Sequence, residues 1–199
     1  MTSENMQTTV QLSEEEENFC RSYREDLDAV QPEAPGEKKA LFAKLSQGDT
    51  LAKGRLTELY LATVLETAMA YAGQGVMLSD LVQEGNIALM LSLESLNAES
   101  PDMGQDVCEE QVCAAIRSSM QETLEEQELL KSANDTIVTK VNLISQGVSN
   151  LTEELDRKVT VEELAAYLNM PEDEVADILR LAGEGIEVEG NHHDHHHGH

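Results

Sequence analysis

Apolar residues recur at intervals of three and four along most of this chain, the period of α-helices that bury one side. The expected fold class is therefore all-α. The helices expected from this period lie near residues 13–29, two within 38–71 that meet at Gln47-Gly48-Asp49, near 78–96 and 107–130, and two short ones that begin at Thr160 and Met170.

The segment 78–96 shows this period most clearly. Its buried side is expected to hold Leu78, Leu81, Val82, Gly85, Ala88, Leu89, Leu93 and Leu96. The opposite side carries Gln83, Asn86, Ile87, Met90 and Glu94, with Asp80 at its edge. Ile87 and Met90 among polar neighbours indicate a surface that a partner covers. Isolated exposed apolar residues are also ordinary in monomers, and from the period alone this explanation is favoured.

Turn-forming residues and helix caps divide the chain. Pro101 and Gly104 predict a loop over 97–106, and in the helix that follows we expect Cys113 to be buried and Cys108 to be half-exposed. Thr160 and Glu163 have the spacing of a capping box. The expected domains are an acidic amino-terminal segment and linker over 1–37, a helical domain over 38–132, a small three-helix, helix-turn-helix-like domain over 136–184, and a His-rich flexible tail over 185–199.

Charge and aromatic content argue against nucleic-acid binding by this chain alone. It has 39 acidic and 13 basic residues, a formal net charge of -26, and 3% aromatic residues with no tryptophan. Stacking on single strands needs exposed rings, and affinity for phosphate backbones comes largely from Lys and Arg. The stretch from Ala72 to Asp135 is the least compatible with phosphate, because it holds 13 acids against Arg117 and Lys131.

The remaining composition narrows the chemistry further. Neither a signal leader nor a membrane-spanning apolar run is present, so a soluble cytoplasmic protein that does not enter a membrane is expected. Three cysteines make reduced thiols the default expectation. No phosphate-binding loop or nucleophile elbow occurs, and the body contains no histidine, so we expect neither an enzyme nor a bound cofactor.

All six histidines lie in the last eight residues. Their imidazoles suit nickel or zinc, and adventitious binding by a flexible tail is the expected form. An expression tag is the alternative, although Asp194 and Gly198 interrupt the run. The candidate metal ligands are His192, His193, His195, His196, His197 and His199.

The run from Asp80 to Met90, DLVQEGNIALM, resembles the polymerase-docking helix of bacterial RNA polymerase sigma factors of the primary housekeeping class. Weaker similarity extends the resemblance over about residues 40 to 183. It implies a helical domain like the second sigma domain over 38–132 and one like the third over 136–184. Residues carried over from the docking helix are Asp80, Gln83, Glu84, Asn86 and Met90. The implied partner is the clamp helices of the polymerase largest subunit, or another sigma-binding protein.

The chain departs from this family where promoter DNA would be held. The resemblance places Gln111 at the position of a tyrosine, and Ala114 and Ala115 at the positions of two tryptophans, which melt the promoter in the family. Where the family is basic, residues 121–128 read QETLEEQE. DNA binding is therefore not expected, and the sequence predicts a sigma-like protein that keeps its docking surface and has lost promoter recognition.

Three alternatives remain open at the level of sequence. The chain is either a genuine sigma factor that directs initiation at unusual promoters, or a divergent helical protein whose His-rich tail binds metal or a partner. The third alternative is that the acidic surface mimics DNA. Composition alone does not show whether acidic residues serve mimicry or only solubility.

Overall fold

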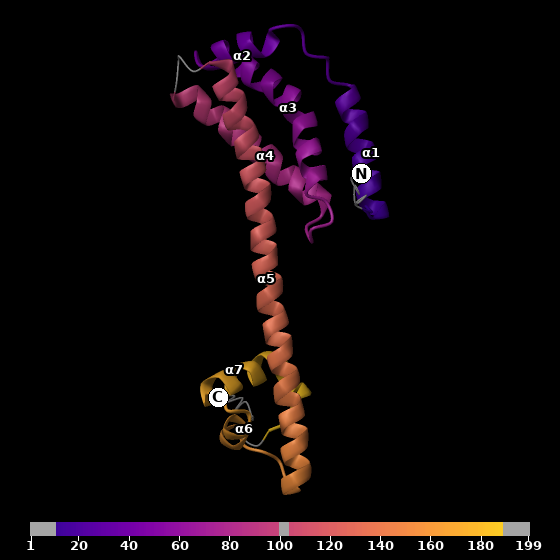
Figure 1. The fold of residues 1–199 in the computed structure, drawn as a ribbon, viewed down its shortest axis with the longest axis vertical. Coiled ribbons are helices and arrows are strands. Elements are labelled where there is room, and N and C mark those ends of the chain that lie inside the picture. The colour runs from indigo at the N-terminus through magenta and orange to yellow at the C-terminus, as the bar shows by residue number, and fades with distance from the viewer. Residues whose placement is uncertain (1–10, 100–103, 189–199) are drawn as a thin grey trace, which may run out of the picture. The chain divides into compact units, whose positions relative to one another are not determined.

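A computed structural model describes residues 11–99 and 104–188, and every regular element in this part of the chain is a helix. The all-α expectation is confirmed. Two compact units are present, residues 1–128 and 129–199. The helices are α1 (Glu14–Asp28), α2 (Glu37–Leu45), α3 (Thr50–Ala70), α4 (Leu78–Glu99), α5 (Gln105–Leu155), α6 (Val161–Leu168), α7 (Glu172–Ala182) and the short 3₁₀ helix η1 (Gly183–Gly185) (Figure 1).

Side-chain caps set where three of these helices begin. Asp49, in the junction expected between two helices, accepts hydrogen bonds from the backbone N–H groups of Leu51 and Ala52 at 2.9 and 3.2 Å and so caps α3. Thr160 and Glu163 form the predicted capping box at α6. Ser13 and Glu16 form a second box at α1. These caps satisfy amides that the first turn of a helix leaves without a partner.

The first unit buries an apolar core to which all five of its helices contribute. No charged or polar side chain is buried among the described residues. Helix α4 contributes Leu78, Leu81, Leu89 and Leu93, which are fully buried. The neighbouring helices add Cys20 from α1, Phe42 and Leu45 from α2, Leu56, Tyr60, Val64 and Ala68 from α3, and Cys108, Val112, Ile116 and Met120 from α5.

Gly85 lets α4 approach its neighbours closely. A Cβ atom at this position would lie 2.3 Å from Cε of Met120 on α5 and 2.9 Å from Cγ1 of Val64 on α3. Both distances are shorter than van der Waals contact, so any side chain would push α4 away from the core.

The ends of helices α4 and α5 differ from those expected. Helix α4 continues to Glu99, so the loop expected over 97–106 is shorter. Helix α5 begins at Gln105 and runs unbroken to Leu155, so the helix end expected at 130 is wrong. No proline or glycine lies between Gln105 and Gly147, and weak helix formers alone do not break a helix. The change of unit falls inside α5, after Glu128.

The burial of the two cysteines of α5 is the reverse of what was expected. Cys108 is buried and Cys113 is half-buried. Cys108 precedes Val112, Ile116 and Met120 by steps of four, so it continues their buried face, whereas Cys113 lies at its edge.

The second unit packs α6 and α7 against the carboxy-terminal part of α5. Its core includes Ile144 from α5, Leu164 from α6, and Val175 and Leu179 from α7. Asn169 ends α6 in the left-handed conformation, with φ of 53°, which allows the tight turn into α7. Arg157 donates hydrogen bonds to both carboxylate oxygens of Glu163, the capping residue of α6.

No helix in the described residues, the long α5 included, combines the length and apolar content that a bilayer crossing requires.

Substituting Gly85→Ala should destabilise the first unit by about 1–3 kcal/mol, because the added methyl group overfills a packed core. Chemical denaturation checks this expectation. Gly54→Ala, on α3 with open space around the same atom, is the matched control and should not destabilise. Equal stability of the two variants would contradict the close approach.

The pKa of Glu163 is expected to depend on Arg157. Hydrogen bonds from Arg157, and then from the backbone N–H of Thr160, lower the pKa of this carboxyl from 4.5 to about 2. Its contribution to the capping of α6 is thus complete above pH 4.5 and is lost as the pH falls through 2. Titration followed by carbon NMR should show the pKa rising in Arg157→Ala and unchanged in Arg180→Ala. No rise in Arg157→Ala would exclude this ion pair as the cause.

Candidate partner-docking site

The predicted two-sided character of α4 is present in the structure. Leu78, Leu81, Val82, Gly85, Leu89, Leu93 and Leu96 are buried as expected, and Ala88 is half-buried. On the opposite side, Gln83, Ile87 and Met90 are exposed, Met90 to 47%. A core-anchored helix therefore presents a row of polar and apolar side chains to solvent.

The five residues expected to dock a partner do not share one environment. Asp80, Gln83 and Met90 are exposed, Glu84 is half-buried, and Asn86 is also half-buried. Asn86 was expected on the exposed side of the helix, and this expectation is not met. Its Nδ2 donates a hydrogen bond to Oη of Tyr23 on α1 at 3.5 Å. Its Oδ1 is buried and has no hydrogen-bond partner among the described residues.

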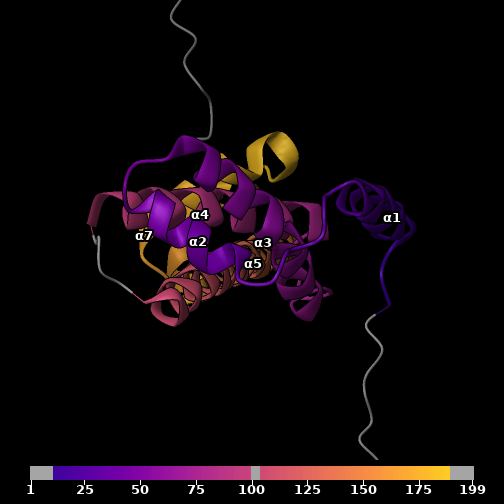
Figure 2. The same cartoon turned by 90° about the horizontal axis from the view of Figure 1, so that it is seen from above.

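Helix α1, at one edge of the first unit (Figure 2), is tied to the start of α4 by Glu16. One carboxylate oxygen of Glu16 accepts from the backbone N–H of Leu78 at 3.3 Å, and the other accepts from Ser13 at 2.9 Å. These bonds, the one from the Ser13 backbone first, lower the pKa of Glu16, although partial burial opposes them. The capping spacing could have revealed the bond to Ser13 but not the one to Leu78.

On the α1 side of this contact, burial also affects the pKa of Tyr23. Burial raises the pKa of Tyr23, and the hydrogen bond from Asn86 partly offsets the rise. Tyr23 stays a neutral phenol and can both accept from Asn86 and pack its ring against Phe19, with ring centroids 5.7 Å apart. The contact between α1 and α4 thus combines one polar pair with apolar packing.

The three positions at which the resemblance to sigma factors would place promoter-melting aromatic residues lie on α5. Gln111 and Ala114 are exposed, and Ala115 is half-buried. Further along, Gln121 donates from Nε2 to Oη of Tyr71 at 2.9 Å. The carboxylates of Glu122, Glu125, Glu126 and Glu128 are exposed.

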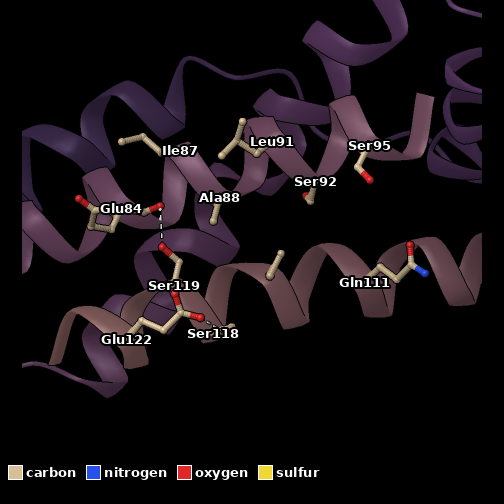
Figure 3. Close-up of a pocket in the computed structure, with 11 residues that line it drawn as sticks. Glu84, Ile87, Ala88, Leu91, Ser92, Ser95, Gln111, Ser118, Ser119 and Glu122 are labelled. Atoms are coloured by element: carbon tan, nitrogen blue, oxygen red, sulfur yellow. Dashed lines mark hydrogen bonds between the residues drawn. The ribbon is translucent and has the colours of Figure 1, made fainter. Parts of the chain in front are cut away.

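A groove of about 630 Å³ lies between α4 and α5. Ile87, Ala88 and Leu91 line it from α4, and Ala115, Ser119 and Glu122 line it from α5 (Figure 3). Ala115 and Gln111, two of the residues that replace the family's aromatic residues, therefore line this groove. Gln111 lies at the end away from Glu84 and Glu122 (Figure 3).

Comparisons with known proteins agree with the resemblance to sigma factors. The family described as sigma-70 region 3 matches residues 139–196. Proteins named RNA polymerase sigma factor SigA match 169 residues, or 85% of this chain, at 28% identity in Listeria monocytogenes and Listeria innocua and at 27% in Clostridium acetobutylicum. The chain is thus similar to housekeeping sigma factors over most of its own length. It spans 44% of the length of these relatives.

The candidate metal ligands of the sigma-factor-like chain, His192 to His199, lie outside the described residues. Within those residues, no group of three or more His, Cys, Asp or Glu side chains could hold a metal ion. Cys20, Cys108 and Cys113 form no disulfide, and burial raises the pKa of both Cys20 and Cys108.

Substituting Glu16→Gln should loosen α1 from α4 in the sigma-factor-like chain, because an amide oxygen accepts a weaker hydrogen bond than a carboxylate. Amide hydrogen exchange at Leu78 should accelerate severalfold. Glu15→Gln removes the same charge from an exposed neighbour and should leave that exchange rate unchanged. Equal rates in the two variants would show that Glu16 does not hold the start of α4.

Proposed function

We propose that this sigma-factor-like chain is a non-enzymatic transcription protein that docks through α4. Its partner is core RNA polymerase, at the clamp helices of the largest subunit, or another protein that binds sigma factors. The observation that carries the proposal is the Asp80–Met90 motif on a helix that exposes Asp80, Gln83 and Met90. The similarity to proteins named RNA polymerase sigma factor supports the same assignment.

Anchoring of α4 favours docking on physical grounds. The buried side of the helix is held by leucines packed against α3 and α5, so its outer side chains start from a fixed backbone. A partner that binds them does not have to order the helix first, and the entropic cost of association is smaller.

In the same proposal, promoter recognition has been lost. Two observations support this part: α5 has no aromatic residue, and its exposed stretch after Gln121 carries four glutamates. Carboxylates repel phosphate and release no counterions from DNA. A chain of this kind regulates initiation by occupying the polymerase, because it fills the sigma-docking surface without opening a promoter.

A genuine sigma factor is the second candidate function. The match to sigma factors over 169 residues favours it. This candidate requires the chain to direct initiation at a promoter, whereas the first requires only docking.

Substituting Gln83→Ala together with Met90→Ala should weaken binding to core polymerase by about tenfold, because exposed side chains at the centre of an interface carry much of the affinity. A pull-down with purified core enzyme, followed by titration, measures this loss. Gln127→Ala, an exposed glutamine on α5, is the control and should bind as the unchanged chain does. If the unchanged chain binds neither core polymerase nor any sigma-binding protein, the proposal is refuted.

Run-off transcription with core polymerase and a library of promoters separates the two candidates. We expect no specific transcript and no permanganate reactivity of promoter thymines, since no aromatic side chain on α5 can capture an unpaired base. A transcript that depends on this chain would establish the sigma factor instead.

A further inference from the structure

The groove between α4 and α5 lies on one flank of the docking face. By the helical period of α4, Ile87, Ala88 and Leu91 are displaced around the helix from Gln83 in one direction, and Asn86 is displaced in the other. Helix α1 therefore covers one flank, through Asn86, while the groove leaves the other accessible.

The groove is apolar at its centre. Leu91 is 65% exposed and Ile87 is 39% exposed. The small side chain of Ala88 faces the space between the helices (Figure 3), and Ala115 lines the groove from α5. Large exposed apolar residues beside small ones leave room for an apolar side chain of a partner. Binding there would remove the apolar surfaces of both the groove and the partner from water.

One end of the groove is acidic. Glu84 and Glu122 line it, no basic side chain does, and Glu125, Glu126 and Glu128 continue the negative charge along exposed α5. Serine hydroxyls order this end: Ser118 donates to the carboxylate of Glu122 at 3.0 Å, and Ser119 donates to the backbone carbonyl of Glu84 at 3.4 Å.

The negative charge of the groove determines which class of partner can bind there. Nucleic acid is repelled, because the only charged groups that line the groove are the carboxylates of Glu84 and Glu122. A second copy of the same face would oppose acids with acids. A cationic partner gains both electrostatic attraction and apolar burial.

We propose that the α4–α5 groove binds a positively charged amphipathic helix of a partner protein. Apolar side chains of that helix rest on Ile87, Leu91 and Ala115, and a Lys or Arg reaches Glu84 and Glu122. The inference goes beyond the proposed function, because the groove shares only Glu84 with the expected docking residues and extends from α4 onto α5.

The test uses the full chain and a labelled synthetic helix of about 20 residues, with leucines at every third or fourth position and lysines elsewhere. Fluorescence anisotropy measures its affinity. Ala115→Trp fills the groove without changing charge and should weaken binding by about tenfold. Ala114→Trp adds the same ring at the exposed neighbouring position outside the groove and should bind as the unchanged chain does. Equal affinities of the two variants would overturn the proposal.

A second pair of variants does not disturb packing. Glu122→Gln and Glu125→Gln remove one charge each from exposed positions of α5, and only Glu122 lines the groove. Glu122→Gln should weaken peptide binding severalfold more than Glu125→Gln does. Equal losses would indicate attraction to the overall charge of the chain and would overturn the assignment.

Two further outcomes would replace the proposed occupant. Binding of a labelled single-stranded oligonucleotide that Glu122→Gln strengthens and that excess peptide displaces would assign the groove to nucleic acid. Self-association in sedimentation velocity that Ala115→Trp abolishes would assign it to a second copy. Gln83→Ala should leave peptide binding unchanged, so failure at the groove and failure of polymerase docking are distinguishable.

Discussion

The close approach of α4 to α3 and α5 is the constraint on which the first unit depends. Gly85 has no side chain, and the space a Cβ atom would fill is taken by Met120 and Val64. With its leucines buried on that side, α4 cannot rotate without exposing them. The orientation of its outer side chains, the groove beside α5 and the contact with α1 therefore all follow from one packing contact.

The acidic residues of this chain have more than one physical role. Glu16 and Glu163 accept backbone hydrogen bonds at helix starts, where negative charge is also favoured by the helix dipole. Those on α5 after Gln121 face solvent and make the surface hostile to phosphate. Individual carboxylates thus stabilise helix starts, whereas the exposed ones on α5 make that surface unfavourable for phosphate.

Prediction from sequence succeeded where a local pattern was sufficient. The period of apolar residues identified the buried side of α4, and the cap spacing identified the starts of α3 and α6. It failed at the expected end of the helix near 130, because Ser132 to Asp135 weaken a helix without breaking it. It also exchanged the burial of Cys108 and Cys113, since spacing locates a buried face only to within one residue.

The sequence by itself determined the helices, their apolar sides and the Asp80–Met90 motif, because these depend on residues within a few turns of one another. Only the tertiary structure decided that Asn86 is held by Tyr23, 63 positions away, and that Glu16 reaches Leu78, 62 positions away. It also decided that Ala115 borders a groove with Leu91. Contacts of this kind depend on how the helices pack, and no local pattern encodes the distance between side chains on different helices.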